Sequence, residues 1–213
     1  MIKIENVDVC GWEAAIRGMR NPLLSHDKSD SYWTTIVDEH TLEEAKFEHF
    51  VGDNDLELMK KLVNAGSDHS KFMRYITVTC DITAPDYWFK EFSTYRVGVT
   101  ENSTSTMHRI HSKEFTLDDF SCEHLYHLAL TRLKDIIDDL NTYREFYLES
   151  KSKDDWWQLI QLLPMSYNYR RTVIFNYQVL RNMYHSRKNH KLDEWRLFCE
   201  WVETLPYSEL ITM

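Results

Sequence analysis

Glycine is scarce in this chain: there are five in 213 residues, and none lies in a phosphate-binding pattern. The G-x-G-x-x-G and G-x-x-x-x-G-K-S/T loops need glycine because their backbone must approach the phosphates closely. Both patterns are missing, which removes the main support for a Rossmann or P-loop nucleotide site. A nucleotide bound by this chain would therefore be held by side chains.

Cysteine is also scarce, and Cys10, Cys80, Cys122 and Cys199 form no C-x-x-C pair. Zinc sites and disulfide frameworks use clustered cysteines, so we expect no metal and free thiols, most of them packed as small hydrophobic side chains. No run approaches the ~18 uncharged apolar residues of a membrane helix. The first ten residues lack an apolar segment with a cleavage site, so we expect no signal peptide, no membrane partner and a cytoplasmic location.

Positive charge is in deficit, with a formal net charge of -9. An acidic protein lacks the broad basic face that nonspecific nucleic-acid binding needs, so we expect no nucleic-acid partner. Basic residues nevertheless gather near the C-terminus. They are Arg170, Arg171, Arg181, Arg187, Lys188, Lys191 and Arg196. A local cluster of this kind fits either a small anionic ligand or a solvated helix face.

Apolar residues make up 43% of the chain, which is typical of a globular domain. Periodicity predicts strands and helices in mixed order, and hence an α+β domain. The predicted strands are 2–9 and 72–82. The predicted helices are 12–19, 53–65 with Asp53 as N-cap, 121–149, a short one before Pro164, and two near 172–187 and 191–204. The polar segment 21–32 is predicted to be a loop, either functional or a mobile surface loop.

The segment from Ala84 to His108 reads APDYWFKEFSTYRVGVTENSTSTMH. It predicts a strand ending at Ala-Pro and a short aromatic-rich helix, followed by an Arg and a polar Glu-Asn-Ser. This order resembles the signature region of the flavin-dependent thymidylate synthases, in which Arg-His-Arg follows the aromatic helix and Arg-Tyr closes the segment. Arg96 matches the last Arg of Arg-His-Arg, whereas Thr94 and Tyr95 replace its partners and the closing Arg-Tyr is lost.

Two further blocks resemble the same family in the same order, so the resemblance covers roughly residues 53–110 and 159–206. Gly66 to Arg74 resembles the family's Gly-His-x-Ser-Pro-Phe-Glu-His, with Arg74 at the place of the last His. Leu163-Pro164 and the following residues resemble the family's Leu-Pro, Arg, Asn, Leu-Arg and Glu-Ile-Arg. The residues at the matching places are Arg170, Asn176, Arg187, Glu194 and Arg196.

The resemblance implies a single α+β domain over residues 1–213, with a mixed or antiparallel sheet and segregated helices. It implies an enzyme that methylates deoxyuridine monophosphate to thymidylate, using FAD, NADPH and methylenetetrahydrofolate. It also implies a homotetramer whose active sites combine residues of several subunits. Because the flavin carries the hydride and the one-carbon unit, the protein would hold the phosphate, stack the flavin and polarise the uracil carbonyl.

For substrate, the resemblance assigns Arg187 to the uracil ring, where planar donors would stabilise developing charge in catalysis. It assigns Arg170 to the phosphate, because a bidentate guanidinium suits a dianion; the adjacent Arg171 could exchange roles with it. Glu101 and Ser103 would match the family's substrate-facing Glu-x-Ser if the segment carries one deletion.

Without that deletion, Glu101-Asn102 is an inverted Asn-Glu and Thr104 replaces the substrate-facing Ser. We prefer the alignment with the deletion because it keeps two polar roles and gives Ser103 a place in catalysis.

For the flavin, the resemblance assigns Arg74, Tyr95, Arg96 and Asn176. Tyr95 could stack on the isoalloxazine ring or belong to the core. Arg74 could pair with a phosphate, favour an anionic reduced flavin or face water.

The altered signature leaves other interpretations open. One is a catalytically silent homologue that keeps the fold as a nucleotide-binding or assembly module, and another is an unrelated α+β protein. A related one-carbon transfer to another pyrimidine nucleotide is a third. The pairs His108/His111 and His124/His127 have metal-like spacing but no obvious third ligand, so we expect solvated or core histidines.

Overall fold

A four-stranded antiparallel sheet with the order β1-β4-β6-β5 organises the molecule, and β2 pairs with β3 in a separate hairpin. The computed structural model describes residues 1–36 and 46–213. Their strands are β1 Lys3–Cys10, β2 Tyr32–Ile36, β3 Lys46–Phe50, β4 Thr77–Pro85, β5 Thr100–Ser103 and β6 Asn168–Asn176. Their helices are α1 Trp12–Arg20, α2 Asp53–Asn64, α3 Asp86–Phe92, α4 Thr106–Arg109, α5 His127–Ser150, α6 Lys153–Leu162, α7 Tyr177–Arg187, α8 Asp193–Glu203 and α9 Glu209–Thr212. The predicted α+β class is confirmed.

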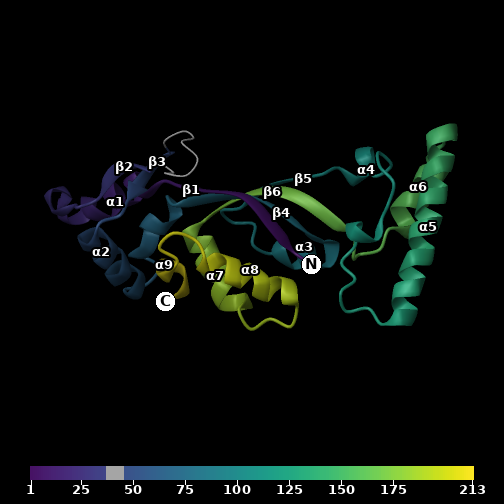
Figure 1. Ribbon diagram of the computed structural model, residues 1–213. Coiled ribbons are helices and arrows are strands. Elements are labelled where there is room, and N and C mark those ends of the chain that lie inside the picture. The colour runs from purple at the N-terminus through teal and green to yellow at the C-terminus, as the bar shows by residue number, and fades with distance from the viewer. Residues whose placement is uncertain (37–45) are drawn as a thin grey trace.

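The two faces of this sheet differ in what lies on them. Alternate residues of a strand point to opposite faces, and in β4 one set, from Val78 to Ala84, is buried while the other, from Thr77 to Thr83, is half-buried. Helices α3, α7 and α8 lie on one side of the sheet in Figure 1. We call that side the covered face and the opposite side the open face.

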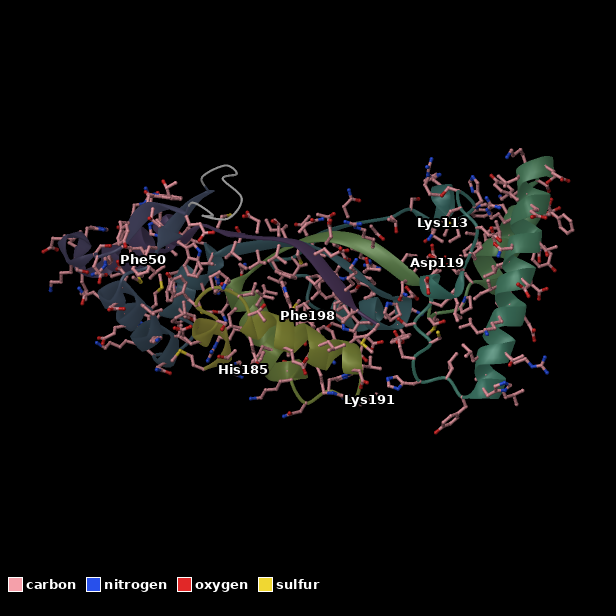
Figure 2. The ribbon with its side chains drawn as sticks, viewed as in Figure 1. Phe50, Lys113, Asp119, His185, Lys191 and Phe198 are labelled. Atoms are coloured by element: carbon pink, nitrogen blue, oxygen red, sulfur yellow. The ribbon has the colours of Figure 1, made fainter. Side chains whose placement is uncertain are left out.

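The main core lies under the covered face and is strongly aromatic. Trp88 of α3 and Trp195 and Phe198 of α8 are fully buried, and the Trp88 and Trp195 ring centroids are 4.8 Å apart. Figure 2 shows Phe198 beneath the sheet. Burial of each such ring stabilises the fold by roughly 2–3 kcal/mol relative to exposure. This core fixes α3 and α8 against each other.

A second, smaller core lies at the far end of the sheet, where α5 and α6 pack as a helical hairpin (Figure 1). Its buried members include Leu133 and Leu140 of α5 and Leu159 of α6. The segment before α5 closes it, with Lys113 paired to Asp119 at its rim (Figure 2). The outer side of α5 near its start stays apolar and exposed.

The loop between α1 and β2 is ordered around a buried ion pair. Arg20 is 3% exposed and Asp55 0%, and Arg20 Nε lies 2.6 Å from Asp55 Oδ1. Ser29 and Ser31 each donate a hydroxyl hydrogen bond of 2.6 Å to Asp55 Oδ2. Burial alone would raise the pKa of Asp55, but these hydrogen bonds and Arg20 outweigh it and lower the pKa. The segment 21–32 is therefore anchored to α2.

Most predicted elements are confirmed, but four boundaries were wrong. Residues 172–176 belong to β6, not to a helix, because Val173 and Phe175 face the core while their neighbours face outward, a period of two. Phe72 lies in a 3-10 turn, Ser70–Arg74, and the strand begins only at Thr77. The N-cap of α2 is Gly52. The long helix begins at His127, six residues later than predicted.

The prediction of free cysteines is confirmed. Cys80 and Cys199 are buried, and burial raises the pKa of their thiols to about 12 and about 11. Cys10 is exposed. Among residues 1–36 and 46–213, no helix has the length and apolarity that crossing a membrane requires.

Candidate functional site

Arg187, the last residue of α7, lies at the centre of a polar cluster between α3 and α8. Its Nη1 lies 2.8 Å from Glu91 Oε2, and its Nε donates to Tyr95 Oη at 2.9 Å. The guanidinium carbon lies 4.9 Å from the Trp195 ring centroid and 5.5 Å from that of Tyr95. With His190, these residues form what we call the Arg187 cluster.

Glu91 Oε2 accepts three donors in this cluster. Besides Arg187 Nη1, Trp195 Nε1 donates at 3.1 Å and His190 Nε2 lies at 3.2 Å. The other ring nitrogen of His190, Nδ1, accepts from the backbone N–H of Leu192 at 3.2 Å. With Nδ1 accepting, Nε2 is the ring nitrogen that donates to Glu91.

The local sequence explains why these side chains meet. In α3, Trp88, Phe89 and Phe92 are buried, which leaves Glu91 toward the edge of the core. Tyr95 follows four residues later in the turn after the helix. Arg187 is favoured at the C-terminal end of α7, where a cation complements the helix dipole. The cluster is thus held by two packed helices and a core tryptophan.

The other predicted substrate residues lie together elsewhere. Glu101, Ser103 and Arg170 border a shallow depression of about 620 Å³ at the β5 edge of the sheet. Ser103 Oγ donates to the backbone carbonyl of Thr104 at 3.1 Å. Arg187 does not line this depression. Three of the four predicted substrate residues therefore border one depression, with Glu101 and Ser103 on the side of the sheet that carries Arg171, and Arg187 lies in another cluster.

Arg170 and Arg171 point to opposite faces of the sheet and have different carboxylate partners. Arg170 Nη2 lies 2.7 Å from Asp81 Oδ2 on the open face. Arg171 Nη1 lies 2.9 Å from Glu101 Oε2, and its guanidinium carbon lies 3.9 Å from the ring centroid of Phe89. Arg171 Nε is buried and has no hydrogen-bond partner in the part of the chain that the structure describes.

Asp81 gathers several donors on the open face. Thr172 Oγ1 donates at 2.6 Å, and Arg170 Nη2 and Asn6 Nδ2 each donate at 2.7 Å. These hydrogen bonds, that of Thr172 foremost, hold the pKa of Asp81 well below its usual range. Arg170 is therefore neutralised in the absence of a ligand, and a phosphate would compete with Asp81 for it.

The predicted flavin residues lie at three places around α7. Asn176 is the N-cap of α7, and its Oδ1 accepts from Val179 N at 3.0 Å. Arg96 is exposed, with Nε donating to the Ser93 carbonyl at 3.0 Å, and Arg74 is exposed at the end of its 3-10 turn. Tyr95 is half-buried in the Arg187 cluster. Its hydroxyl accepts from Arg187, so one edge of the ring is already engaged.

The remaining matched residues, and two of the four histidines, His124 and His111, have structural partners. Glu194 is buried and accepts a short hydrogen bond from Tyr87, and Arg196 pairs with Asp193. His124 Nε2 lies 3.0 Å from the same Asp193. His111 lies edge-on to Tyr147. Among the described residues, no group of three or more histidine, cysteine, aspartate or glutamate side chains could hold a metal ion.

Glu91 and His190 are the site residues that sequence reasoning missed. A signal for Glu91 was present, because it lies four residues before Tyr95 and between core aromatics of the signature helix. His190 gave none, since its contact with Glu91 depends on how the loop after α7 folds back.

Comparison with known proteins places this architecture. The sequence matches no protein-family model and no curated protein significantly. Two structures of the flavin-dependent thymidylate synthase ThyX from Helicobacter pylori, each with FAD and dUMP, are similar. The first has a TM-score of 0.68 at 18% sequence identity and covers 98% of this chain; the second has a TM-score of 0.67 at 17% identity and covers 100% of this chain. In both comparisons, 97% of the other chain is covered.

The UMP/dUMP methylase PolB from Streptomyces cacaoi, bound to 5-Br dUMP, is also similar. Its TM-score is 0.66 at 14% identity, with 100% of this chain and 95% of that chain covered. The resemblance drawn from the three sequence blocks is thus confirmed at the level of three-dimensional structure: the chain has the fold of the flavin-dependent thymidylate synthases.

Proposed function

We propose that this protein methylates the uracil ring of deoxyuridine monophosphate, using FAD as cofactor and NADPH and methylenetetrahydrofolate as co-substrates. The Arg187 cluster is the observation that carries the proposal. A guanidinium is held there by Glu91 and Tyr95 and lies over Trp195, and its place in the sequence resembles that of the family's uracil-contacting Arg. The likeness to structures that contain FAD and dUMP supports the same substrate class.

Arg187 would stabilise negative charge as it develops on a uracil carbonyl. Its Nη1 and Nε are engaged, whereas Nη2 makes no hydrogen bond to the described residues and is the donor left for a ligand. Because the bonds to Glu91 and Tyr95 fix the guanidinium plane, the donor is preorganised and needs no reorientation when charge develops. A lysine, with one point charge and no planar fork, would lose this arrangement.

The residues around α7 fit a flavin. Ser70, Asn176 and Gln178 offer hydroxyl and amide groups, and Ser70 Oγ donates to Gln178 Oε1 at 3.1 Å. Arg74 and Arg96 are exposed cations without a carboxylate partner among the described residues, which suits the flavin diphosphate. When bound, the flavin would supply the hydride and one-carbon chemistry. The chain would bind it, orient it and exclude water.

The active site would combine residues of neighbouring copies in a homotetramer. Arg187 does not line the depression bordered by Glu101, Ser103 and Arg170. One copy would therefore supply Arg187, and a neighbouring copy would supply the depression. The apolar start of α5 offers a contact surface, because Tyr126 is 89% exposed and Leu128 69%. In the completed site Arg170 would exchange Asp81 for the nucleotide phosphate, and Glu101 and Ser103 would orient the base and sugar.

The first experiment is the absorbance spectrum of freshly purified protein and of protein reconstituted with FAD. A band near 450 nm is expected. Tritium release from deoxyuridine monophosphate labelled at C5, with methylenetetrahydrofolate and NADPH, then measures turnover. Arg187→Ala should lower turnover by roughly 100-fold or more, the usual loss when one charge-stabilising donor is removed. Lys188→Ala, a neighbouring exposed cation, is the matched control and should stay active.

Two results would contradict the proposal. Colourless protein that cannot be reconstituted would remove the flavin. Flavin and nucleotide binding without tritium release would instead favour a catalytically silent nucleotide-binding module.

Mixing inactive variants tests the shared site separately. Arg187→Ala and Arg170→Ala homomers should both be poorly active. Mixed oligomers formed after co-expression should regain part of the turnover, because some sites then receive both intact arginines. Failure to regain any turnover, with mixed oligomers demonstrated by mass, would place both arginines in the same subunit's site.

A further inference from the structure

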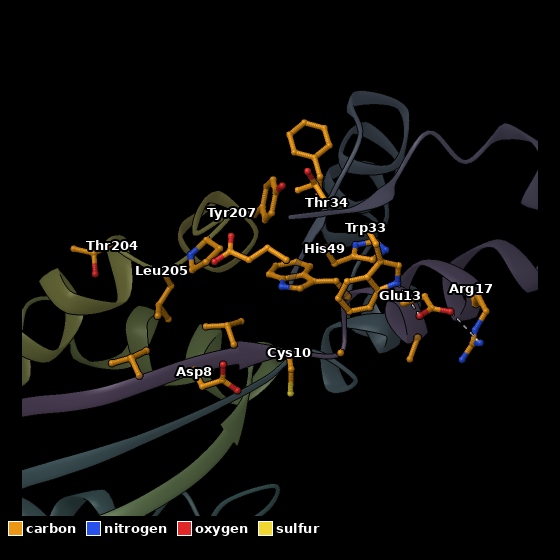
Figure 3. A pocket seen from close by; sticks show the side chains of 18 of the residues that line it. Asp8, Cys10, Glu13, Arg17, Trp33, Thr34, His49, Thr204, Leu205 and Tyr207 are labelled. Carbon is orange, nitrogen blue, oxygen red and sulfur yellow. Dashed lines mark hydrogen bonds and ion pairs between the residues drawn. The ribbon is translucent and has the colours of Figure 1, made fainter. Parts of the chain in front are cut away.

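A separate cavity of about 840 Å³ lies between the end of β1, the start of α1, the β2–β3 hairpin and the loop between α8 and α9. None of the residues assigned above to substrate or flavin lines it. Its size falls within the usual range for small-molecule sites, roughly 300–1,000 Å³. Figure 3 shows the side chains that line it.

The walls of this cavity are aromatic. Trp12 is buried, and its ring centroid lies 5.0 Å from that of Tyr207 in an edge-on arrangement. Trp33 is 56% exposed, and its ring centroid lies 5.0 Å from that of His49 with the planes perpendicular. Trp201 and Phe50 also line the cavity. Aromatic faces carry negative electrostatic potential and attract cations within about 6 Å.

The charged groups of the cavity are mainly acidic. Asp8, Glu13 and Glu48 line it against one cation, Arg17. The positive charge of Arg17 is partly neutralised by Glu13, because Arg17 Nη1 lies 3.4 Å from Glu13 Oε1. Figure 3 shows Asp8 on β1 toward one end, and Glu13 with Trp33 and His49 toward the other. The Asp8 carboxylate makes no hydrogen bond or ion pair with the described residues.

His49 does not offset this negative charge at neutral pH. Burial lowers the pKa of its imidazole, and Glu13 and Asp55 only partly oppose that effect. Its Nδ1 is buried and has no hydrogen-bond partner in the described ranges.

We propose that this cavity binds a small organic cation, an ammonium group carried on a flat apolar body. The body would lie among Trp33, Trp12 and Tyr207, and the ammonium group would face Asp8 or Glu13. Aromatic faces and an excess of carboxylates select together for such a ligand, because an anion of the same shape would meet like charge and a small hydrated metal ion would gain nothing from the rings.

The test is isothermal titration calorimetry of the whole protein with two probes of one shape. Tryptamine carries an ammonium group on an indole, and indole-3-propionate carries a carboxylate on the same ring system. Tryptamine should bind at least tenfold more tightly than the acid. FAD and deoxyuridine monophosphate are present at saturating concentration in a parallel titration, and tryptamine affinity should not change, because the cavity shares no residue with the proposed nucleotide site.

Variants locate the binding. Trp33→Ala should weaken tryptamine binding roughly tenfold, and Asp8→Asn and Glu13→Gln each several-fold. Glu57→Gln is the matched control, because Glu57 is an exposed helical carboxylate that also pairs with a cation four residues later, at 3.3 Å, and does not line the cavity. It should leave the affinity unchanged.

Three results would overturn the proposal. The first is that tryptamine at millimolar concentration releases or absorbs no heat of binding. The second is that tryptamine and indole-3-propionate bind with equal affinity. The third is that Trp33→Ala, Asp8→Asn and Glu13→Gln all leave the affinity for tryptamine unchanged. Circular dichroism of each variant confirms that it is folded before its affinity is compared.

Discussion

Arg170 and Arg171 are neighbours on β6, yet they belong to two different environments. Arg170 lies on the open face with its side chain 50% exposed and pairs with Asp81, whose carboxylate also accepts a hydrogen bond from the Thr172 hydroxyl. Arg171 has a 16% exposed side chain that lies over the Phe89 ring and pairs with Glu101. The same kind of ion pair thus has a half-exposed arginine on one face and an arginine stacked on an aromatic ring on the other.

The difference arises because alternate residues of β6 point to opposite faces of the sheet, and the two faces have different roles. On the covered face, side chains of β6 pack in the core, and Arg171 is held in place at the margin by Phe89 and Glu101. The open face keeps an arginine whose partner can be exchanged, because water can solvate Asp81 when a phosphate takes its place. An exchangeable cation suits ligand binding, and a stacked one suits structure.

The largest effect is expected from Phe175 and Ile174, adjacent residues on the two faces. Phe175→Ala should lower the free energy of unfolding by about 3–5 kcal/mol, because Phe175 is buried in the main core. Ile174→Ala should cost less than about 1 kcal/mol, since Ile174 is 39% exposed. Urea unfolding of both variants gives the two values. Similar losses would mean that the open face is buried in solution, as it would be in an assembly.

A smaller effect is expected from the arginines themselves. Arg171→Ala should destabilise the fold by about 1–2 kcal/mol, because it removes the contact with Phe89 and leaves Glu101 unpaired. Arg170→Ala should change stability less but weaken nucleotide binding more. Unfolding midpoints and nucleotide titrations of the two variants report both quantities. The reverse pattern would assign the phosphate to Arg171.

The smallest effect concerns acid. The folded pKa of Asp81 lies below its ordinary value of 3.8, so its hydrogen bonds stabilise the fold fully above that value. This stabilisation is lost as the pH falls below about 4 toward the folded pKa. The difference in unfolding midpoint between the wild type and Asp81→Asn should therefore be constant from pH 5 to 7 and shrink below pH 4. A difference that grows with acid would refute the lowered pKa.

Sequence patterns predicted where helices form better than they predicted which segments contact one another. Asp53–Asn64 and Trp12–Arg20 form as predicted because each has an apolar stripe of helical period. Thr172–Asn176 was misassigned because Val, Ile and Phe in succession read equally well as the start of a helix or as a strand. Only pairing with β4 decides between them.

The candidate site was predictable in composition but not in grouping. Three matching blocks identified Arg187 and Tyr95, and the structure places these two side chains in contact. The partners of the paired arginines lie far along the chain: Asp81 for Arg170, and Glu101 for Arg171. Which arginine meets which carboxylate depends on a one-residue register that no local pattern encodes.

The ion pair between Arg20 and Asp55 has a consequence for how this chain can change. Breaking one side of a buried ion pair costs about 3–5 kcal/mol, whereas replacing both partners by apolar residues of similar volume is often neutral. The carboxylate also holds Ser29 and Ser31. Positions 20 and 55 should therefore covary among related sequences, and a lineage that loses the pair would also be free to lengthen or shorten the loop between α1 and β2.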